Sequence, residues 1–207
     1  MGASLQWRQP PDRENNPHGD IVEFGRGRSR GRGYLAHSDR VGPGILLLDQ
    51  IGRERAKVLN AEGFTTLVPD AYDARDEGSV LEAAAGFLSS NWHPRLAVMA
   101  FGPITGSAVS TLVSSELSVD VLVLHESVWL GDEVPQVPVI GHFSAERDDD
   151  ALESVFDAIA DAGHETELYI YEGTREGFCD PRSSHFSPEH AALADARTLD
   201  ALEYHLS

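Results

Sequence analysis

The chain has 207 residues, and 41% of them are hydrophobic, which is enough for one domain with a buried core. Its 34 acidic and 16 basic residues give a formal net charge of −18, which repels nucleic acids and anionic membranes. Cys179 is the only cysteine, so no internal disulfide can form. The N-terminus lacks the basic and then apolar order of a signal peptide, and no apolar run is long enough to span a membrane. We therefore expect a cytoplasmic protein with neither nucleic-acid nor membrane partners.

The first part of the chain predicts an arm followed by a β-hairpin. Residues 1–19 are polar and rich in proline, so we expect a loosely ordered arm before a single domain at 20–207. Two strand-like runs follow, at 20–24 and 33–36, and the arginine-rich segment 25–33 begins between them. Glycine for turn geometry and arginine for solvation predict the tip of a hairpin there. An arginine-rich RNA contact is the alternative, and the net charge opposes it.

The rest of the domain alternates between strand and helix patterns. Apolar runs bounded by turn residues predict strands at 42–49, 64–70, 96–101, 120–125, 137–143 and 165–171. Helical spacing predicts helices at 53–62, at 79–89, after Pro103, at 150–162 and at 188–205. This alternation predicts an α/β fold, with a mostly parallel sheet and helices on both of its faces.

In a sheet of this kind, ligands bind beyond the carboxyl ends of the strands. The strand ends of interest therefore lie at 49–51, 102–103, 144–148 and 173–178. The second of them has the strand-turn-helix pattern of a nucleophile elbow. Its turn residue is Gly102, which offers no nucleophile, and Pro103 has no N–H for an oxyanion hole. The alternative interpretation is structural, with Gly102 capping a helix whose first position is Pro103.

Several short segments, taken in order, resemble the dienelactone hydrolase family of the α/β-hydrolase fold. They are Gly33-Tyr-Leu-Ala36 with Gly42-Pro-Gly-Ile-Leu-Leu-Leu48, Ala61-Glu-Gly-Phe64 with Val68-Pro-Asp70, Pro138-Val-Ile-Gly-His-Phe143, Tyr171-Glu-Gly173 with Gly177-Phe178, and Ala196-Arg-Thr-Leu199. The resemblance covers residues 20–205. It implies an α/β-hydrolase fold with a small-molecule pocket above the strand ends.

The functional positions depart from the pattern of that family. The family's nucleophile falls on Gly102, its late histidine on Glu176, and the glutamate after its first core strand on Gln50. The triad acid is best matched by Asp148. The resemblance thus implies a ligand pocket without ordinary cysteine or serine hydrolysis. We expect the ligand to contact six residues: Gln50, Ile51, Phe101, Gly102, Pro103 and His142.

Asp148 and Glu176 occupy positions at which the family holds an acid and a histidine in direct contact. Two carboxyl groups at that distance would share a proton, because both cannot ionise comfortably. Such a pair could catalyse a cyclisation, dehydration or isomerisation of a carbonyl-bearing molecule. The alternative is that Arg175 or Arg147 neutralises Glu176, or that Glu176 points into solvent.

Two further functions stay open. A relocated nucleophile, Thr105 or Ser107 with His142 or His185, would make the chain a hydrolase. Loss of all catalysis would make it a pseudoenzyme that binds a ligand or partner. Cys179 is interpreted as apolar filler, and the aspartates at 149–150 as helix N-terminal residues. No zinc-ligand spacing, phosphate loop or dinucleotide fingerprint is present, so we expect no metal and no cofactor.

Overall fold

The computed structural model describes residues 19–37, 42–49, 51–70, 77–91, 95–115, 118–127, 134–146 and 149–207. Its strands are β1 (Asp20–Phe24), β2 (Gly31–Ala36), β3 (Gly44–Leu48), β4 (Thr65–Pro69), β5 (Leu96–Phe101), β6 (Val121–His125), β7 (Val139–Ser144) and β8 (Thr166–Tyr171). Its helices are η1 (Gly27–Ser29), α1 (Gly52–Ala61), α2 (Glu77–Asn91), η2 (Pro103–Thr105), α3 (Gly106–Val113), α4 (Asp149–Asp161) and α5 (Pro188–Leu206). The predicted strands and helices are therefore confirmed, with shifts of a few residues at their ends.

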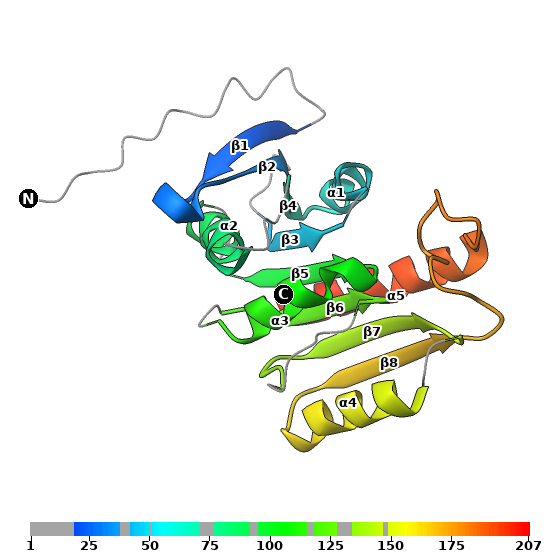
Figure 1. Ribbon diagram of the computed structural model, residues 1–207. Helices are drawn as coiled ribbons and strands as arrows, with labels where there is room; N and C mark the ends of the chain where they lie inside the picture. Colours follow the sequence, from blue (N-terminus) through cyan, green and yellow to red (C-terminus); the bar gives the residue numbers. More distant parts are fainter. Residues whose placement is uncertain are drawn as a thin grey trace, which may run out of the picture.

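The strands form one sheet in the order β1-β2-β4-β3-β5-β6-β7-β8 (Figure 1). β1 pairs with β2, and β2 with β4, in antiparallel fashion. The pairings from β4 through β3 to β8 are all parallel. The strand order reverses around β3, between the hairpin side and the β5-to-β8 side. At such a switch point the carboxyl ends of neighbouring strands leave a crevice.

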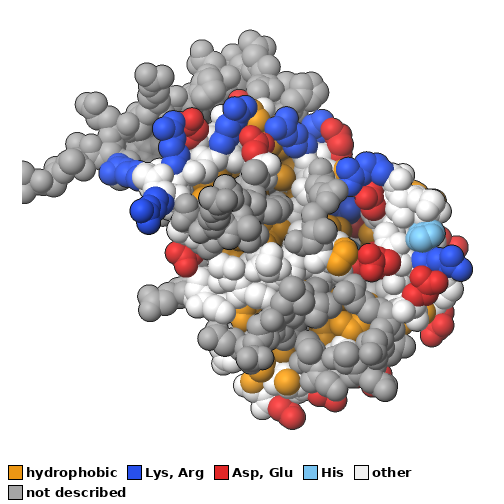
Figure 2. Space-filling view, in the orientation of Figure 1, with side chains coloured by type: hydrophobic (Ala, Val, Ile, Leu, Met, Phe, Trp, Pro, Cys, Tyr) orange, Lys and Arg blue, Asp and Glu red, His pale blue; other side chains and the backbone are white. Residues whose placement is uncertain are grey.

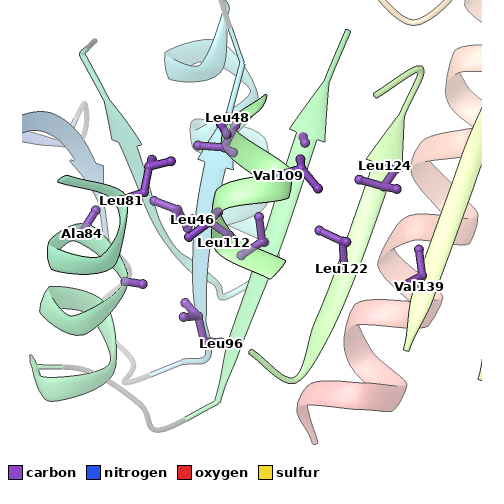
Figure 3. Packing of buried hydrophobic residues seen from close by; sticks show 14 of the residues in the cluster. Leu46, Leu48, Leu81, Ala84, Leu96, Val109, Leu112, Leu122, Leu124 and Val139 are labelled. Atoms are coloured by element: carbon purple, nitrogen blue, oxygen red, sulfur yellow. The ribbon is translucent and has the colours of Figure 1, made fainter. Parts of the chain in front are cut away.

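Helices cover both faces of the sheet because the strands are apolar on both sides. In β3 the side chains alternate, so that Leu46 and Leu48 face α2 and α3, while Ile45 and Leu47 face α1 and α5. Figure 3 shows the first of these layers: Leu46 and Leu48 meet Leu81 and Ala84 of α2, Val109 and Leu112 of α3, and Leu122 and Leu124 of β6. This double burial explains why the strands read as continuous apolar runs.

The arginine-rich segment is the tip of the predicted hairpin. Strands β1 and β2 pair in antiparallel register, and the short η1 turn connects them. The side chains of Arg26, Arg28, Arg30 and Arg32 are exposed, and Figure 2 shows Lys and Arg side chains gathered in this part of the surface. Arg30 pairs with Glu23 at 2.7 Å, within the hairpin. Residues 1–18 of the predicted N-terminal arm, which was expected at 1–19, lie outside the described residues.

Gly141 of β7 lies where the sheet packs closely against α4. A Cβ atom placed on Gly141 would collide with the ring of Phe156 and come within 2.7 Å of the Phe143 ring. We predict that Gly141→Ala lowers the free energy of unfolding by about 1–3 kcal/mol, because the buried rings cannot move freely.

Gly86→Ala is the matched control, since a Cβ atom on Gly86 of α2 would meet nothing within 4 Å. It should raise the free energy of unfolding by roughly 0.5–1 kcal/mol through the lower entropy of the unfolded chain. Urea unfolding of both variants measures the two effects. A neutral Gly141→Ala would contradict the close packing of β7 on α4.

Candidate functional site

A cavity of about 290 Å³ opens at the carboxyl ends of β3, β5 and β6. Its lining includes Ile51, Phe101, Gly102, Pro103 and Glu176, five of the residues that the sequence places at the ligand site. The other lining residues are Asp49, Arg55, His125, Glu126, Gly177, Cys179, Asp180, Arg182 and Ser183. Gln50 and Asp148 lie outside the described residues, so the expected pairing of Asp148 with Glu176 stays a prediction.

The turn at Gly102 keeps the backbone shape of an elbow without its reactive groups. β5 ends at Phe101, Gly102 has φ +79°, and η2 begins at Pro103 and leads into α3. A positive φ strains residues that carry a side chain, and glycine removes that strain. A Cβ atom on Gly102 would meet nothing within 4 Å, so the space for a nucleophile is still present.

Both expected donors of an oxyanion hole are absent or occupied. Pro103 has no N–H. The backbone N–H of Ile51, the donor expected from the other side of the cavity, donates instead to Asp49 Oδ1 at 3.0 Å. A developing negative charge on a substrate oxygen would therefore find neither of these two donors in place.

The relocated nucleophiles do not contact an imidazole among the described residues. Thr105 is buried, and its hydroxyl donates to the Gly102 carbonyl at 2.8 Å and lies 2.7 Å from Ser127 Oγ. Ser107 is exposed on α3. His185 is exposed and its Nδ1 lies 3.0 Å from the Glu176 carbonyl oxygen. No hydrogen bond among the described residues joins Thr105 or Ser107 to His142 or His185.

Glu126 is the residue at this site that sequence reasoning missed. It follows β6, is 4% exposed, and accepts a hydrogen bond through Oε2 from the Gly177 N–H at 2.5 Å. Its φ of +55° is the only positive one on a non-glycine residue in the described parts of the chain. Strained backbone of this kind concentrates at functional sites. The sequence signal was the polar triplet His125-Glu126-Ser127 at the end of an apolar strand beside the elbow strand.

Glu176 projects from the loop after β8 and is exposed at the cavity. Arg175, one of the two arginines that the alternative interpretation pairs with Glu176, pairs instead with Glu146, at 3.0 Å. The bond from Gly177 to Glu126 holds this loop against the end of β6, so the two glutamates line the same cavity. The described residues therefore include two glutamates at the site, Glu126 and Glu176, while the pairing of Asp148 with Glu176 stays a prediction.

Arg55 of α1 holds three parts of the site together. Its Nε donates to Asp49 Oδ2 at 3.0 Å, its Nη2 to the Cys179 carbonyl oxygen at 3.2 Å, and its Nη1 to Asp195 Oδ1 at 3.4 Å. The guanidinium also lies 3.7 Å from the centre of the Phe101 ring. Burial raises the pKa of the neighbouring Cys179 thiol well above its usual range, so this thiol is not an activated nucleophile. Arg55 thus connects the end of β3, the loop after β8 and α5.

Four rings stack side by side across the sheet behind the cavity. Phe101, His125, His142 and Tyr169 are cross-strand neighbours on β5, β6, β7 and β8. The distances between successive ring centres are 4.1, 4.5 and 5.3 Å. Arg55 covers one end of this ring stack, and Arg197 covers the other, 4.1 Å above Tyr169. His142, expected to contact the ligand, is fully buried in the stack and does not line the cavity, because its ring lies behind that of His125.

Both histidines of the ring stack are neutral. Burial, with help from His142 and Arg55, lowers the pKa of His125 well below its ordinary value. Burial and the charge of Arg197 lower the pKa of His142 to about 3. The described residues contain no group of three His, Cys, Asp or Glu side chains that could hold a metal ion. None of the helices in the described ranges is long and apolar enough to cross a membrane.

No protein-family model matches the sequence, and no curated protein matches it. Solved structures do match. A dienelactone hydrolase from Anabaena variabilis has a TM-score of 0.66 and 14% identity, with 91% of this chain and 98% of that one covered. A thermophilic esterase from Thermogutta terrifontis has a TM-score of 0.65 and 13% identity, with 95% and 96% covered. An acylaminoacyl peptidase from Pyrococcus horikoshii has a TM-score of 0.70 and 12% identity, with 91% of this chain but 41% of that one covered.

The buried state of His142 makes stability depend on pH. In the unfolded chain the ring takes up a proton near its ordinary pKa of 6.5, but in the folded protein only near 3. The unfolded state therefore binds more protons between these values, and lowering the pH from 6.5 towards 3 destabilises the fold. We predict that His142→Gln reduces this slope by about 1 kcal/mol per pH unit on average between pH 7 and pH 5, approaching about 1.4 kcal/mol per pH unit at the lower end.

Urea unfolding between pH 7 and pH 5 measures the slope. His185→Gln, at an exposed ring, is the control and should leave the slope unchanged. NMR titration of the folded protein gives the same information without a variant. Protonation of His142 near pH 6.5 would show that the ring is not held neutral.

The elbow also predicts what would happen if the missing catalytic side chains were restored. We predict that Gly102→Cys with Glu176→His gives feeble esterase activity, because Pro103 supplies no N–H and the Ile51 N–H is bonded to Asp49. Adding Pro103→Leu should raise the rate about 10²- to 10³-fold by restoring one oxyanion donor. Hydrolysis of p-nitrophenyl acetate measures the series. An efficient double variant that gains nothing from Pro103→Leu would mean that residue 103 does not line an oxyanion hole.

Proposed function

We propose that this chain, which has the α/β-hydrolase fold seen in dienelactone hydrolases, binds a small uncharged carbonyl compound and acts on it by proton transfer between carboxyl groups. One observation carries the proposal. The cavity is lined by Glu126 and Glu176, while the elbow that borders it has Gly102 and Pro103 in place of a nucleophile and its oxyanion donor.

The hydrolases among the structural neighbours support the location of the site. They do not support assigning their hydrolytic reaction to this chain. Hydrolysis through a covalent intermediate needs a nucleophile, a base and donors for the oxyanion. Here Gly102 has no side chain, and the Ile51 N–H is already bonded to Asp49. The cavity does hold one hydroxyl, on Ser183, but its oxygen accepts the N–H of His185 at 3.0 Å.

Two carboxyl groups in one cavity can divide the roles of acid and base. These two roles need one carboxyl that carries a proton and one that is ionised. The ionised group can then remove a proton from the carbon next to a carbonyl, while the protonated group donates to the carbonyl oxygen. An isomerisation, dehydration or cyclisation follows from such transfers, and none of these needs an acyl intermediate. In this proposal Glu126 has the role that the sequence analysis expects of Asp148.

The charge and size of the cavity support an uncharged ligand. Its lining residues include four carboxylic acids and two arginines, so a carboxylate ligand meets an acidic surface. Both arginines are paired, Arg55 with Asp49 at 3.0 Å and Arg182 with Asp180 at 3.0 Å. A volume of about 290 Å³ accommodates a ring with one carbonyl group.

Exchange of the α-hydrogens of cyclohexanone in deuterated water, followed by proton NMR, tests the proposal. We predict exchange above that of a denatured sample. Glu126→Gln and Glu176→Gln should each slow it about 10²-fold or more, since they remove an acid-base group while keeping its shape. Glu172→Gln, an exposed residue of the same loop that does not line the cavity, is the matched control and should keep the full rate.

Two outcomes would contradict the proposal. One is turnover of p-nitrophenyl acetate with labelling of the protein by a fluorophosphonate, which would favour a relocated nucleophile. The other is the absence of both exchange and cyclohexanone binding, which would favour a protein-binding pseudoenzyme.

A further inference from the structure

A chain of hydrogen bonds runs through the ring stack from Arg197 to His125. Arg197 Nη1 donates to the Tyr171 hydroxyl oxygen at 3.4 Å, and that hydroxyl lies 2.9 Å from His142 Nδ1. Thr198 Oγ1 lies 3.1 Å from His142 Nε2 and 3.1 Å from His125 Nε2. Tyr171, His142, Thr198 and His125 are all buried, so these groups have to satisfy one another.

The chemistry of the donors fixes the direction of this chain. A guanidinium only donates, so the Tyr171 oxygen accepts from Arg197, and among the described partners of this hydroxyl His142 Nδ1 is the acceptor left for its proton. A neutral imidazole carries one N–H, so His142 then donates from Nε2 to Thr198 Oγ1. The single proton of Thr198 is left for His125 Nε2. His125 must therefore carry its proton on Nδ1.

The assignment requires that both rings be neutral, which their surroundings ensure. Burial lowers the pKa of both histidines, and the positive charges of Arg55 and Arg197 lie at the two ends of the ring stack. Neither ring has a carboxylate as a hydrogen-bond partner among the described residues. A carboxylate there would favour the charged form.

His125 Nδ1 is buried and has no hydrogen-bond partner in the described parts of the chain. His125 is also one of the residues that line the cavity. We infer that the Nδ1–H of His125 is a preorganised donor that binds the carbonyl oxygen of the ligand. The inference rests on the proposed function for the class of ligand, and it adds the residue that recognises the carbonyl. Tyr171, His142 and Thr198 act as positioning residues, because they reach the ligand only through His125.

A donor of this kind makes the cavity selective. A buried N–H without an acceptor destabilises the empty site, and a ligand oxygen removes that cost. The neutral ring of His125 would become an acceptor at Nδ1 only if the bonds through Thr198 and His142 were reversed as well. The wall of the cavity therefore favours ligands with an acceptor oxygen, such as ketones, lactones and amides, over alkanes of the same shape.

The first test is the tautomeric state of the two rings, measured by nitrogen-15 NMR of histidine-labelled protein near pH 7. We expect an Nδ1–H resonance for His125 and an Nε2–H resonance for His142. Tyr171→Phe should shift His125 towards the Nε2–H form although the Tyr171 hydroxyl bonds only to His142 and Arg197 among the described residues. Tyr204→Phe, at an exposed tyrosine of α5, is the matched control and should change neither ring. An Nε2–H form of His125 in the unaltered protein overturns the inference.

The second test is the binding of cyclohexanone by calorimetry and NMR. The bound ketone should shift the His125 Nδ1–H resonance. His125→Asn keeps an N–H near the position of Nδ1 and should retain affinity, whereas His125→Gln keeps only the contact with Thr198 and should bind roughly 3- to 10-fold more weakly. The inference is overturned if the ketone binds without shifting the His125 resonance and His125→Gln binds it as tightly as the unaltered protein. That result would leave the proposed function intact. Failure of the unaltered protein to bind the ketone contradicts the proposed function, while the tautomers still test the hydrogen-bond chain.

Discussion

Strands β5 to β8 run parallel and in register, and this pairing brings the rings of Phe101, His125, His142 and Tyr169 face to face. Side chains alternate along a strand, so a slip of one residue would turn a ring to the other face of the sheet. The same register places the carboxyl ends of β5 and β6 next to each other, where Gly102 donates to the His125 carbonyl oxygen at 2.8 Å. The wall of the cavity and the ring stack behind it therefore depend on the same backbone hydrogen bonds between β5, β6, β7 and β8.

The ring stack is neutral, and charged groups lie only around it. Two arginines lie over its ends, and each is fixed by other contacts, Arg55 by Asp49 and Arg197 by the rings of Tyr169 and Tyr171. At the far end, a hydrogen bond from Tyr169 to Glu167 raises the pKa of the phenol to about 12, so this ring also carries no charge near neutral pH. A protein with a formal net charge of −18 thus keeps a polar but uncharged layer beneath a cavity bordered by carboxyl groups.

The sequence was sufficient to predict the fold, because doubly buried strands such as Ile45 to Leu48 and the glycine and proline at 102–103 leave direct local signals. It also located five of the cavity residues, since these follow strand ends along the chain. It could not reveal Glu126, whose role depends on the distant loop that brings Gly177 to its carboxylate. The sequence analysis also placed His142 at the ligand, and the structure shows that this was wrong. The position of the His142 ring depends on which strands are neighbours in the sheet, and on what covers the face of the sheet that His142 shares with His125.

Glu126 carries its side chain on a left-handed backbone, which glycine would adopt without cost. Glycine at this position would relieve the backbone strain, but it would also leave the Gly177 N–H without its acceptor. Position 126 is therefore one at which the conformation of the backbone and the contact of the side chain oppose each other. A relative with glycine here would have an unstrained turn after β6 and a loop after β8 that is no longer held to it.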